Sequence, residues 1–193
     1  MNDVYLYNLK FLFLEQIEGI YYTDLIILTL VVAIVCFVPG YILHVKRNLS
    51  WKKVFLFFLI LTYLGVIFIL TILRRDVGSA STRIYTHLNL GFTKTKIYSV
   101  RQTMYSLMNI LLFVPWGLLI GLSWDYKRVV RAITLTTLIG FITSSFVEIM
   151  QLVTRTGRLE VTDLFTNTVG TFVGAIMAVL GAIILKGKQK NEF

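Results

Sequence analysis

Two pairs of polar side chains in the last third of the sequence have types and spacings that could do chemistry. Glu148 and Gln151 are three residues apart, so they share a face if the segment is a helix. Asp163 and Asn167 are four residues apart and would share a face in the same way. Two neighbouring carboxylates can act as general acid and base, and the amides can position a substrate. Arg158, in the segment between the pairs, could hold an anionic group.

Other kinds of site are not indicated by the sequence. His44 and His87 have no second histidine or carboxylate at metal-ligand spacing, and no phosphate loop or nucleophile motif is present. The single cysteine, Cys36, cannot form a thiolate metal site alone and is expected to be a small core residue. Ser144 and Ser145 are expected to satisfy helix carbonyls rather than to attack a substrate. We therefore expect no metal and no cofactor.

The elements that must position these residues are apolar runs long enough to cross a membrane. Apolar residue types make up 56% of the 193 residues, and the mean hydropathy is +0.76. A run of roughly 20 apolar residues crosses a ~30 Å hydrocarbon core as a helix. Five such runs lie at about 25–43, 54–73, 104–124, 129–153 and 164–185. The sequence predicts an all-α polytopic transmembrane bundle of about five spanning helices, in a single membrane domain over 1–193.

The first twenty residues differ from these runs. Their apolar side chains are interrupted by charged residues, including Lys10 and Glu15, so the segment is too short and too charged for a span. We expect residues 1–20 to form a short interfacial helix, with tyrosines at the headgroup level, rather than a sixth span. The segment lacks a basic start and a small-residue cleavage site, so no cleaved signal peptide is expected.

The lysines and arginines predict how the chain is oriented. They flank the apolar runs and form no continuous basic face, so the net charge of +9 does not indicate a nucleic-acid partner. Leaving aside the loop at 74–103, one side of the membrane collects ten of them and the other side three. Short basic loops stay cytoplasmic, which predicts an external N-terminus and a cytoplasmic C-terminus. With that loop counted, the sides carry ten and nine, so the prediction requires the loop to be translocated.

The loop at 74–103 is itself basic. It carries six Lys and Arg against one acidic residue, Asp76, and its glycines and small polar residues argue against a separate folded domain. Two interpretations remain open. The loop could meet anionic lipid headgroups or anionic envelope polymers, or it could be a solvated linker near the headgroups.

Within the spans, several polar and small residues also allow purely structural roles. Asp163 could stabilise a helix N-terminus, and Asn109 and Asn167 could form hydrogen bonds between helices. Pro115 should kink the third span and free a carbonyl near Leu111. A stripe of small residues on the fifth span should let another helix pack closely; it comprises Gly170, Gly174, Ala178 and Gly181. Taken together, however, the polar groups gather at one membrane face, which favours a site.

These residues resemble the VanZ-like family of bacterial membrane proteins. The third span contains N-x-x-x-F-x-P-x-G, at Asn109, Phe113, Pro115 and Gly117. The fourth and fifth contain E-x-x-Q followed by R, D, N and G, at Glu148, Gln151, Arg158, Asp163, Asn167 and Gly170. An arginine that closes the second span, Arg74 or Arg75, fits the pattern too. The matching stretch covers about 74–174.

The resemblance implies a multi-pass protein of the bacterial cytoplasmic membrane. It also implies an association with resistance to teicoplanin and related lipoglycopeptides, without the precursor change that gives vancomycin resistance. It implies no chemical reaction, so whether the protein is an enzyme stays open. The binding residues that it suggests are Arg74, Asn109, Glu148, Gln151, Arg158, Asp163 and Asn167.

Two functions compete. The first is a non-enzymatic envelope protein that binds a membrane lipid, an anionic envelope polymer or the lipoglycopeptide itself at the outer face. The second is an intramembrane enzyme that modifies a lipid or lipid-linked glycan, with Glu148 and Asp163 as the acid/base pair. Arg74 and Arg158 would hold an anionic headgroup, and the substrate would be positioned by Asn109, Gln151 and Asn167. A transporter is less favoured, because the chain shows no internal repeat and few helices.

Overall fold

A computed structural model describes residues 10–11, 14, 18–78, 80, 83–90, 97–124 and 128–190 of the chain. Within them, five helices are long and apolar enough to span a membrane, which confirms the predicted all-α bundle. The predicted interfacial helix over residues 1–20 lies mostly outside the described residues and stays a prediction. The chain is therefore described as a multi-pass membrane protein.

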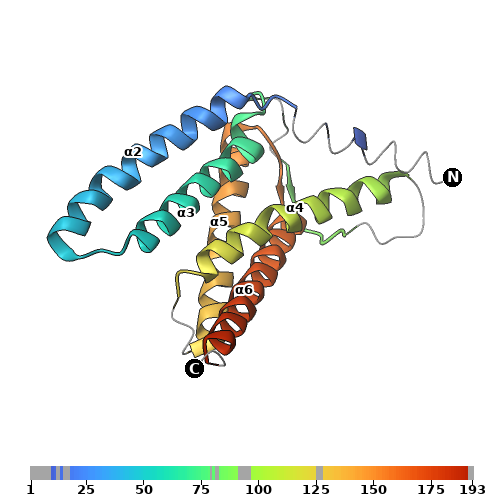
Figure 1. Ribbon diagram of the computed structural model, residues 1–193. Helices are drawn as coiled ribbons and strands as arrows, with labels where there is room; N and C mark the ends of the chain where they lie inside the picture. The colour runs from blue at the N-terminus through green and yellow to red at the C-terminus, as the bar shows by residue number, and fades with distance from the viewer. Residues whose placement is uncertain are drawn as a thin grey trace.

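The five helices carry most of the chain (Figure 1). They are α2 (Tyr22–Arg47), α3 (Trp51–Phe68), α4 (Ile97–Gly121), α5 (Val129–Thr154) and α6 (Val161–Lys190). A π-helical turn, η1 (Ile69–Leu73), continues α3 to the residue predicted as the end of the second span. Two short strands, β1 (Ile84–Tyr85) and β2 (Leu159–Glu160), complete the elements. The start of α4 departs most from its predicted bounds, because the helix begins at Ile97 rather than near residue 104.

Helix α2 packs mainly on α3, on the outside of the bundle (Figure 1). The two helices are joined by a tight turn in which Asn48 adopts a left-handed conformation with φ of 51°. The Nδ1 of His44 donates a hydrogen bond of 2.7 Å to the carbonyl of Leu49, and the centre of its ring lies 5.1 Å from the centre of the Trp51 ring. These contacts fix the turn, while most of the apolar surface of α2 remains exposed, as expected of a helix that faces lipid.

Helices α4 and α6 form the most extensive helix pair among the described elements. Ile110 faces Gly170 and Gly121 faces Ala178, so the two helices run in the same direction. A Cβ atom at Gly174 would collide with the carbonyl oxygen of Val114, so only glycine permits this approach. The predicted small-residue stripe is confirmed from Gly170 to Ala178. It does not extend to Gly181, where an added Cβ would meet nothing within 4 Å.

The apolar core lies where α3, α4 and α5 meet. It consists of Ile67, Phe113, Trp116, Ile120 and Val147, all of them buried. Beside it, the hydroxyl of Tyr63 donates a hydrogen bond of 2.7 Å to the carbonyl of Leu112. This carbonyl lies three residues before Pro115, next to the Leu111 carbonyl expected to be freed by the proline. Tyr63 thus joins α3 to α4 where the proline interrupts the helix.

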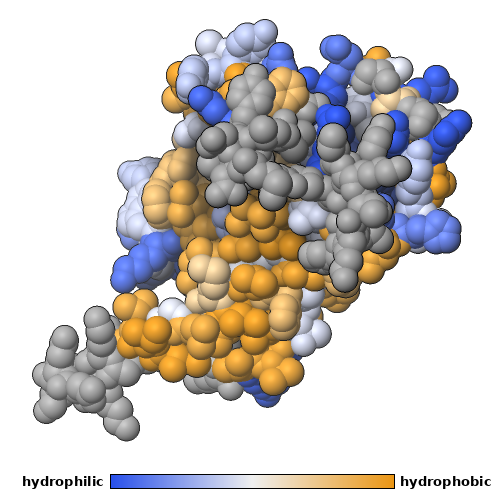
Figure 2. All heavy atoms as spheres, turned by 90° about the vertical axis from the view of Figure 1, so that its right-hand side faces the viewer, coloured by the Kyte–Doolittle hydropathy of each residue, from blue (hydrophilic) through white to orange (hydrophobic). Residues whose placement is uncertain are grey.

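The surface matches this arrangement. Figure 2 shows a band of hydrophobic side chains across the middle of one face, with hydrophilic side chains gathered mainly at the top. The hydrophilic part includes the end of the bundle where α3 and α5 finish and α6 begins. We call this the loop end, because the segment after η1 and the α5–α6 connection both lie there. The polar residues singled out in the sequence lie at this end.

Candidate functional site

The loop end of the bundle brings together most of the polar residues identified in the sequence. We call them the site cluster, and it consists of Arg75, Asn109, Glu148, Gln151, Glu160, Asp163 and Asn167. Glu148 and Gln151 lie in the last two turns of α5, and Asp163 lies in the first turn of α6. Because α5 and α6 run in opposite directions, the end of one helix and the start of the next face each other at this site.

Glu148 is at the centre of the site cluster. Its side chain is only 3% exposed, although it carries a carboxylate. Its Oε2 accepts a hydrogen bond of 2.9 Å from the backbone N–H of Glu160 in β2. Asp163, Glu160 and Arg75 all lie close enough to act on it electrostatically. The α5–α6 connection is therefore folded back onto the carboxylate of Glu148.

Asp163 is the second carboxylate of the cluster. It accepts a side-chain hydrogen bond from Asn109 of α4, and Glu160 and Arg75 act on it electrostatically. Asn109 thus joins α4 to α6, the structural role considered for it, and in doing so it contacts a candidate catalytic group. This contact is consistent with both interpretations of Asn109, a structural hydrogen bond between helices and a direct part in the site.

Arg75 is the arginine that reaches the carboxylates. Its Nη1 donates a hydrogen bond of 3.4 Å to the carbonyl of Thr156. Within the described part of the chain it makes no direct ion pair with Glu148 or Asp163, although its positive charge interacts electrostatically with both carboxyl groups. Arg74, the residue assigned to binding from the sequence, donates from Nε to the carbonyl of Leu70 in its own helix and makes a further interaction as well. Of the two arginines that fitted the sequence pattern, Arg75 belongs to the site cluster.

Gln151 connects α5 to the π-helical turn. Its Nε2 donates a hydrogen bond of 3.0 Å to the carbonyl of Thr71. In a π-helical turn the hydrogen bonds are shifted by one residue, which changes the carbonyls available to a neighbouring helix. Gly157 is close to both Gln151 and Arg75: a Cβ there would be 3.0 Å from Oε1 and from Nη1. The absence of a side chain at Gly157 lets the loop backbone approach both residues.

Asn167 lies one turn deeper in the bundle. Its Nδ2 donates a hydrogen bond of 2.9 Å to the hydroxyl of Ser144, and both residues are buried. Its Oδ1 is buried without a hydrogen-bond partner among the described residues. Ser145 bonds the carbonyl of Phe141, as expected of a helical serine. Ser144 differs from that expectation, because it accepts a bond from another helix.

The loop after η1 covers this end of the bundle. β1 and β2 pair in parallel, with Ile84 opposite Leu159 and Tyr85 opposite Glu160. The backbone N–H groups of Gly78 and Ala80 donate to the carbonyls of Thr154 and Arg155 at 3.2 and 2.8 Å. The described part of this loop is therefore attached to the α5–α6 connection by backbone hydrogen bonds.

Arg158 lies on the α5–α6 connection, to which this loop is attached. It is exposed, and its guanidinium carbon lies 5.6 Å from the centre of the Tyr85 ring, a cation–π contact between the residue before β2 and β1. The structure therefore places Arg158 at the outer surface of the site cluster, directly before β2, the strand that carries Glu160. An anionic group that approaches the loop end would meet Arg158 before it meets Arg75.

Sequence reasoning missed Glu160 and the partners of the two amides. Glu160 is a third carboxylate, two residues after Arg158, and its place between the two polar pairs was the available signal. Thr71 acts through its backbone carbonyl, for which no side-chain signal exists. Ser144 was assigned a local bond, and its position four residues before Glu148 is the only sequence hint that it faces α6.

The arrangement can bind donors and move protons. Three carboxylates can accept hydrogen bonds from hydroxyl or ammonium groups, and Arg75 and Arg158 can bind phosphate oxygens. Neighbouring carboxylates in different surroundings can also serve as acid and base. Among the described residues, no group of three or more His, Cys, Asp or Glu is arranged to hold a metal ion.

The fold and the cluster together define a multi-pass helical membrane protein with a buried polar site at one end. The chain matches the model of the VanZ/LLP1 family over residues 55–184, and it belongs to that family. The match confirms the resemblance seen in the motifs and extends it beyond 74–174, to most of α3 and nearly all of α6. Comparison with curated proteins and with solved structures gave no match.

Proposed function

We propose that the protein lowers the susceptibility of a bacterium to teicoplanin and related lipoglycopeptides. It does so by binding a lipid or an anionic envelope component at the outer face of the cytoplasmic membrane. Its membership of the VanZ/LLP1 family supports the link to resistance. This proposal includes the predicted orientation, with the loop end and its site cluster outside.

The observation that carries the proposal is the burial of Glu148 beside Asp163 at the loop end. An ionisable group within a membrane helix costs a few kcal/mol on insertion scales and by default marks a functional site. The backbone N–H of Glu160 could equally be satisfied by a neutral acceptor, so folding alone does not require a charged group at Glu148. An ionisable group that the fold does not need supports a role in ligand binding.

The chemistry of the cluster suggests what the ligand carries. Arg158 at the surface and Arg75 further in would bind phosphate oxygens. Glu148, Glu160 and Asp163 would accept hydrogen bonds from hydroxyl or ammonium groups. A lipid or lipid-linked glycan whose headgroup has both a phosphate and such donors fits both parts. When the protein binds such a component, a lipoglycopeptide has less access to that component.

Expression in a susceptible bacterium tests this proposal. The expected result is a several-fold rise in the inhibitory concentration of teicoplanin, with little change for vancomycin, in cells whose membranes contain the protein. An unchanged teicoplanin concentration at a verified membrane level would contradict the proposed role in resistance. An equal rise for both drugs would contradict the selectivity for lipoglycopeptides.

A second candidate is an intramembrane enzyme that modifies a lipid or a lipid-linked glycan. The observation that favours it is the electrostatic proximity of Glu148, Asp163 and Glu160, which suits an acid/base pair. Lipid analysis of membranes with and without the protein separates the two candidates. A new or depleted lipid species that depends on Glu148 would support the enzyme, and an unchanged lipid profile in resistant cells would support the binding protein.

A further inference from the structure

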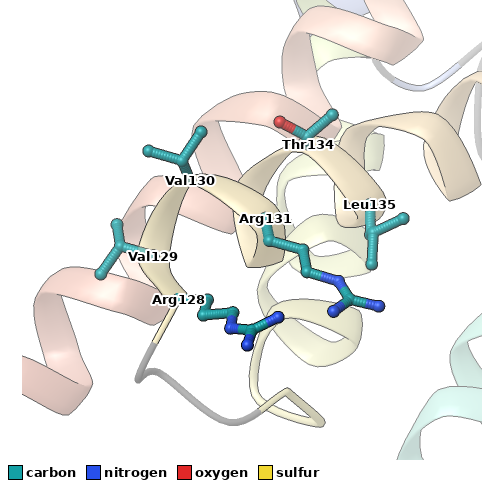
Figure 3. Close-up of a pocket in the computed structure, with 6 residues that line it drawn as sticks. All are labelled: Arg128, Val129, Val130, Arg131, Thr134 and Leu135. Carbon is teal, nitrogen blue, oxygen red and sulfur yellow. The ribbon is translucent and has the colours of Figure 1, made fainter.

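A second candidate site lies at the start of α5, at the opposite end of the bundle from the site cluster. A hollow of about 630 Å³ lies there, lined by Arg128, Val129, Val130, Arg131, Thr134 and Leu135 (Figure 3). All six residues come from one short stretch, so the hollow depends only on how α5 begins. None of them belongs to the site cluster or to the family motifs found in the sequence.

Two arginines give this hollow its charge. Arg128 and Arg131 are three residues apart, and Figure 3 shows their side chains extending on the same side of the first turn of α5. Both are exposed, and the first turn of α5 contains no acidic residue. Within the described part of the chain neither guanidinium has an acidic partner. Two guanidinium groups held this way can together bind the oxygens of one phosphate.

The rest of the lining is mainly apolar. Val130 is 78% exposed, and Leu135 lies beside Arg131 one turn further into the span. The hydroxyl of Thr134 lies at the same depth as Leu135 and can donate to an ester carbonyl. The hollow therefore offers two cationic groups at the start of the helix, and a hydroxyl beside aliphatic surface one turn further in. A glycerophospholipid likewise has its phosphate outermost and its ester and acyl chain further into the membrane.

We propose that this hollow binds an anionic glycerophospholipid, with the phosphate between Arg128 and Arg131 and an acyl chain along Leu135. On the predicted orientation the lipid comes from the cytoplasmic leaflet, which carries the negative surface potential. The site is separate from the proposed resistance function, because it lies in the other leaflet and shares no residue with the site cluster. A soluble anion would use the arginines but would gain nothing from the aliphatic lining.

The test measures lipid retained by the full-length protein in lipid nanodiscs, by native mass spectrometry. Phosphatidylglycerol is compared with phosphatidylcholine of the same acyl chains. The variant is Arg128→Gln with Arg131→Gln, and the matched control is Lys52→Gln with Lys53→Gln. That control removes two exposed charges at the start of α3, on the same predicted side. Inorganic phosphate is added as a competitor, to distinguish a lipid headgroup from a free anion.

The wild-type protein should retain phosphatidylglycerol in preference to phosphatidylcholine. Near a membrane surface each arginine contributes about a fivefold gain in affinity for an anionic lipid, so the double variant should lose roughly thirtyfold. The lysine control should keep the wild-type preference, and millimolar phosphate should not displace the lipid. If the double variant does not stay monodisperse, the single variants carry the test, each with about a fivefold loss.

Three outcomes would overturn the proposal. Equal retention of the two lipids by the wild-type protein would show that no anionic lipid is selected. An equal loss in the lysine control would show a general surface-charge effect rather than a site. Displacement by phosphate alone would show an anion site that does not recognise lipid. None of these outcomes bears on teicoplanin susceptibility, so the proposed function is tested separately.

Discussion

The amide of Asn167 in α6 donates a hydrogen bond of 2.9 Å to the hydroxyl of Ser144 in α5. Asn167 lies one turn after Asp163, and Ser144 lies one turn before Glu148. The helices that present the two carboxylates are therefore joined by a buried polar contact just below them. The polar groups of α5 and α6 thus form two layers, a structural amide within the bundle and charged groups nearer its end.

The inner layer can be tested by a double-mutant cycle. Asn167→Ala and Ser144→Ala should each destabilise the protein, because each leaves a buried polar group without its partner. Their coupling energy should be about 0.6 kcal/mol and at most ~1.7 kcal/mol, the range found for hydrogen bonds between membrane helices. Unfolding in mixed micelles measures all four proteins. Purely additive effects would contradict a direct bond between the two side chains.

The close approach of α4 and α6 gives a second prediction. Gly174→Ala should destabilise the protein by at least ~1–3 kcal/mol, because the added methyl group collides with the Val114 carbonyl of α4. Gly181→Ala is the matched control on the same helix, since an added Cβ there meets nothing within 4 Å. Thermal unfolding in detergent compares the two variants. Equal stability of Gly174→Ala and Gly181→Ala would contradict the packing of α4 on α6.

The two neighbouring arginines should differ in importance. Arg75→Gln should abolish protection against teicoplanin and destabilise the fold by roughly 1–3 kcal/mol, because Glu148 and Asp163 lose the positive charge near them. Arg74→Gln removes a bond to the carbonyl of Leu70 and should have the smaller effect on protection. Inhibitory concentrations at matched membrane levels provide the comparison. The reverse order would assign the site to Arg74, as the sequence alone suggested.

The sequence was sufficient to predict the five spans, because twenty consecutive apolar residues have few other stable environments. It also predicted that Glu148, Gln151, Asp163 and Asn167 lie at one end, because one pair is near the end of a span and the other is at the start of the next span. Close packing of another helix on the fifth span followed from Gly170 and Gly174, since small residues permit close approach; that this helix is α4 came from the structure. These features depend on local sequence alone.

Features that depend on tertiary contacts could not be predicted. The choice of Arg75 over Arg74 depends on how the chain turns after the π-helical η1. Glu160 joins the cluster because its backbone N–H meets Glu148, a contact between a loop and a helix. The pairing of β1 with β2 joins segments about 75 residues apart in the chain, too short and too distant to be read from a pattern. The predicted orientation remains to be tested.

Cysteine labelling tests the orientation. Val77→Cys places a thiol on the loop end, where the native side chain is 80% exposed, and Ser50→Cys places one on the exposed turn between α2 and α3. The single native cysteine, Cys36, is buried and is replaced by alanine in both variants. In intact cells a membrane-impermeant maleimide should label Val77→Cys, and Ser50→Cys only after permeabilisation. The opposite labelling pattern would place the site cluster on the cytoplasmic side.

The central claim is that the buried carboxylate of Glu148 functions in protection and does more than support the fold. Glu148→Gln tests it well, because the new amide oxygen can still accept the bond from Glu160 while the ionisable carboxyl group is lost. Glu18→Gln, which changes an exposed carboxylate before α2, is the matched control. Melting temperature and membrane level are measured for both variants.

The most direct measurement is the inhibitory concentration of teicoplanin for cells that express Glu148→Gln at the wild-type membrane level. We expect the protection to fall to that of cells without the protein, while the melting temperature stays close to the wild-type value and Glu18→Gln remains protective. Full protection by a stably folded Glu148→Gln variant would contradict the assignment of this carboxylate to the functional site.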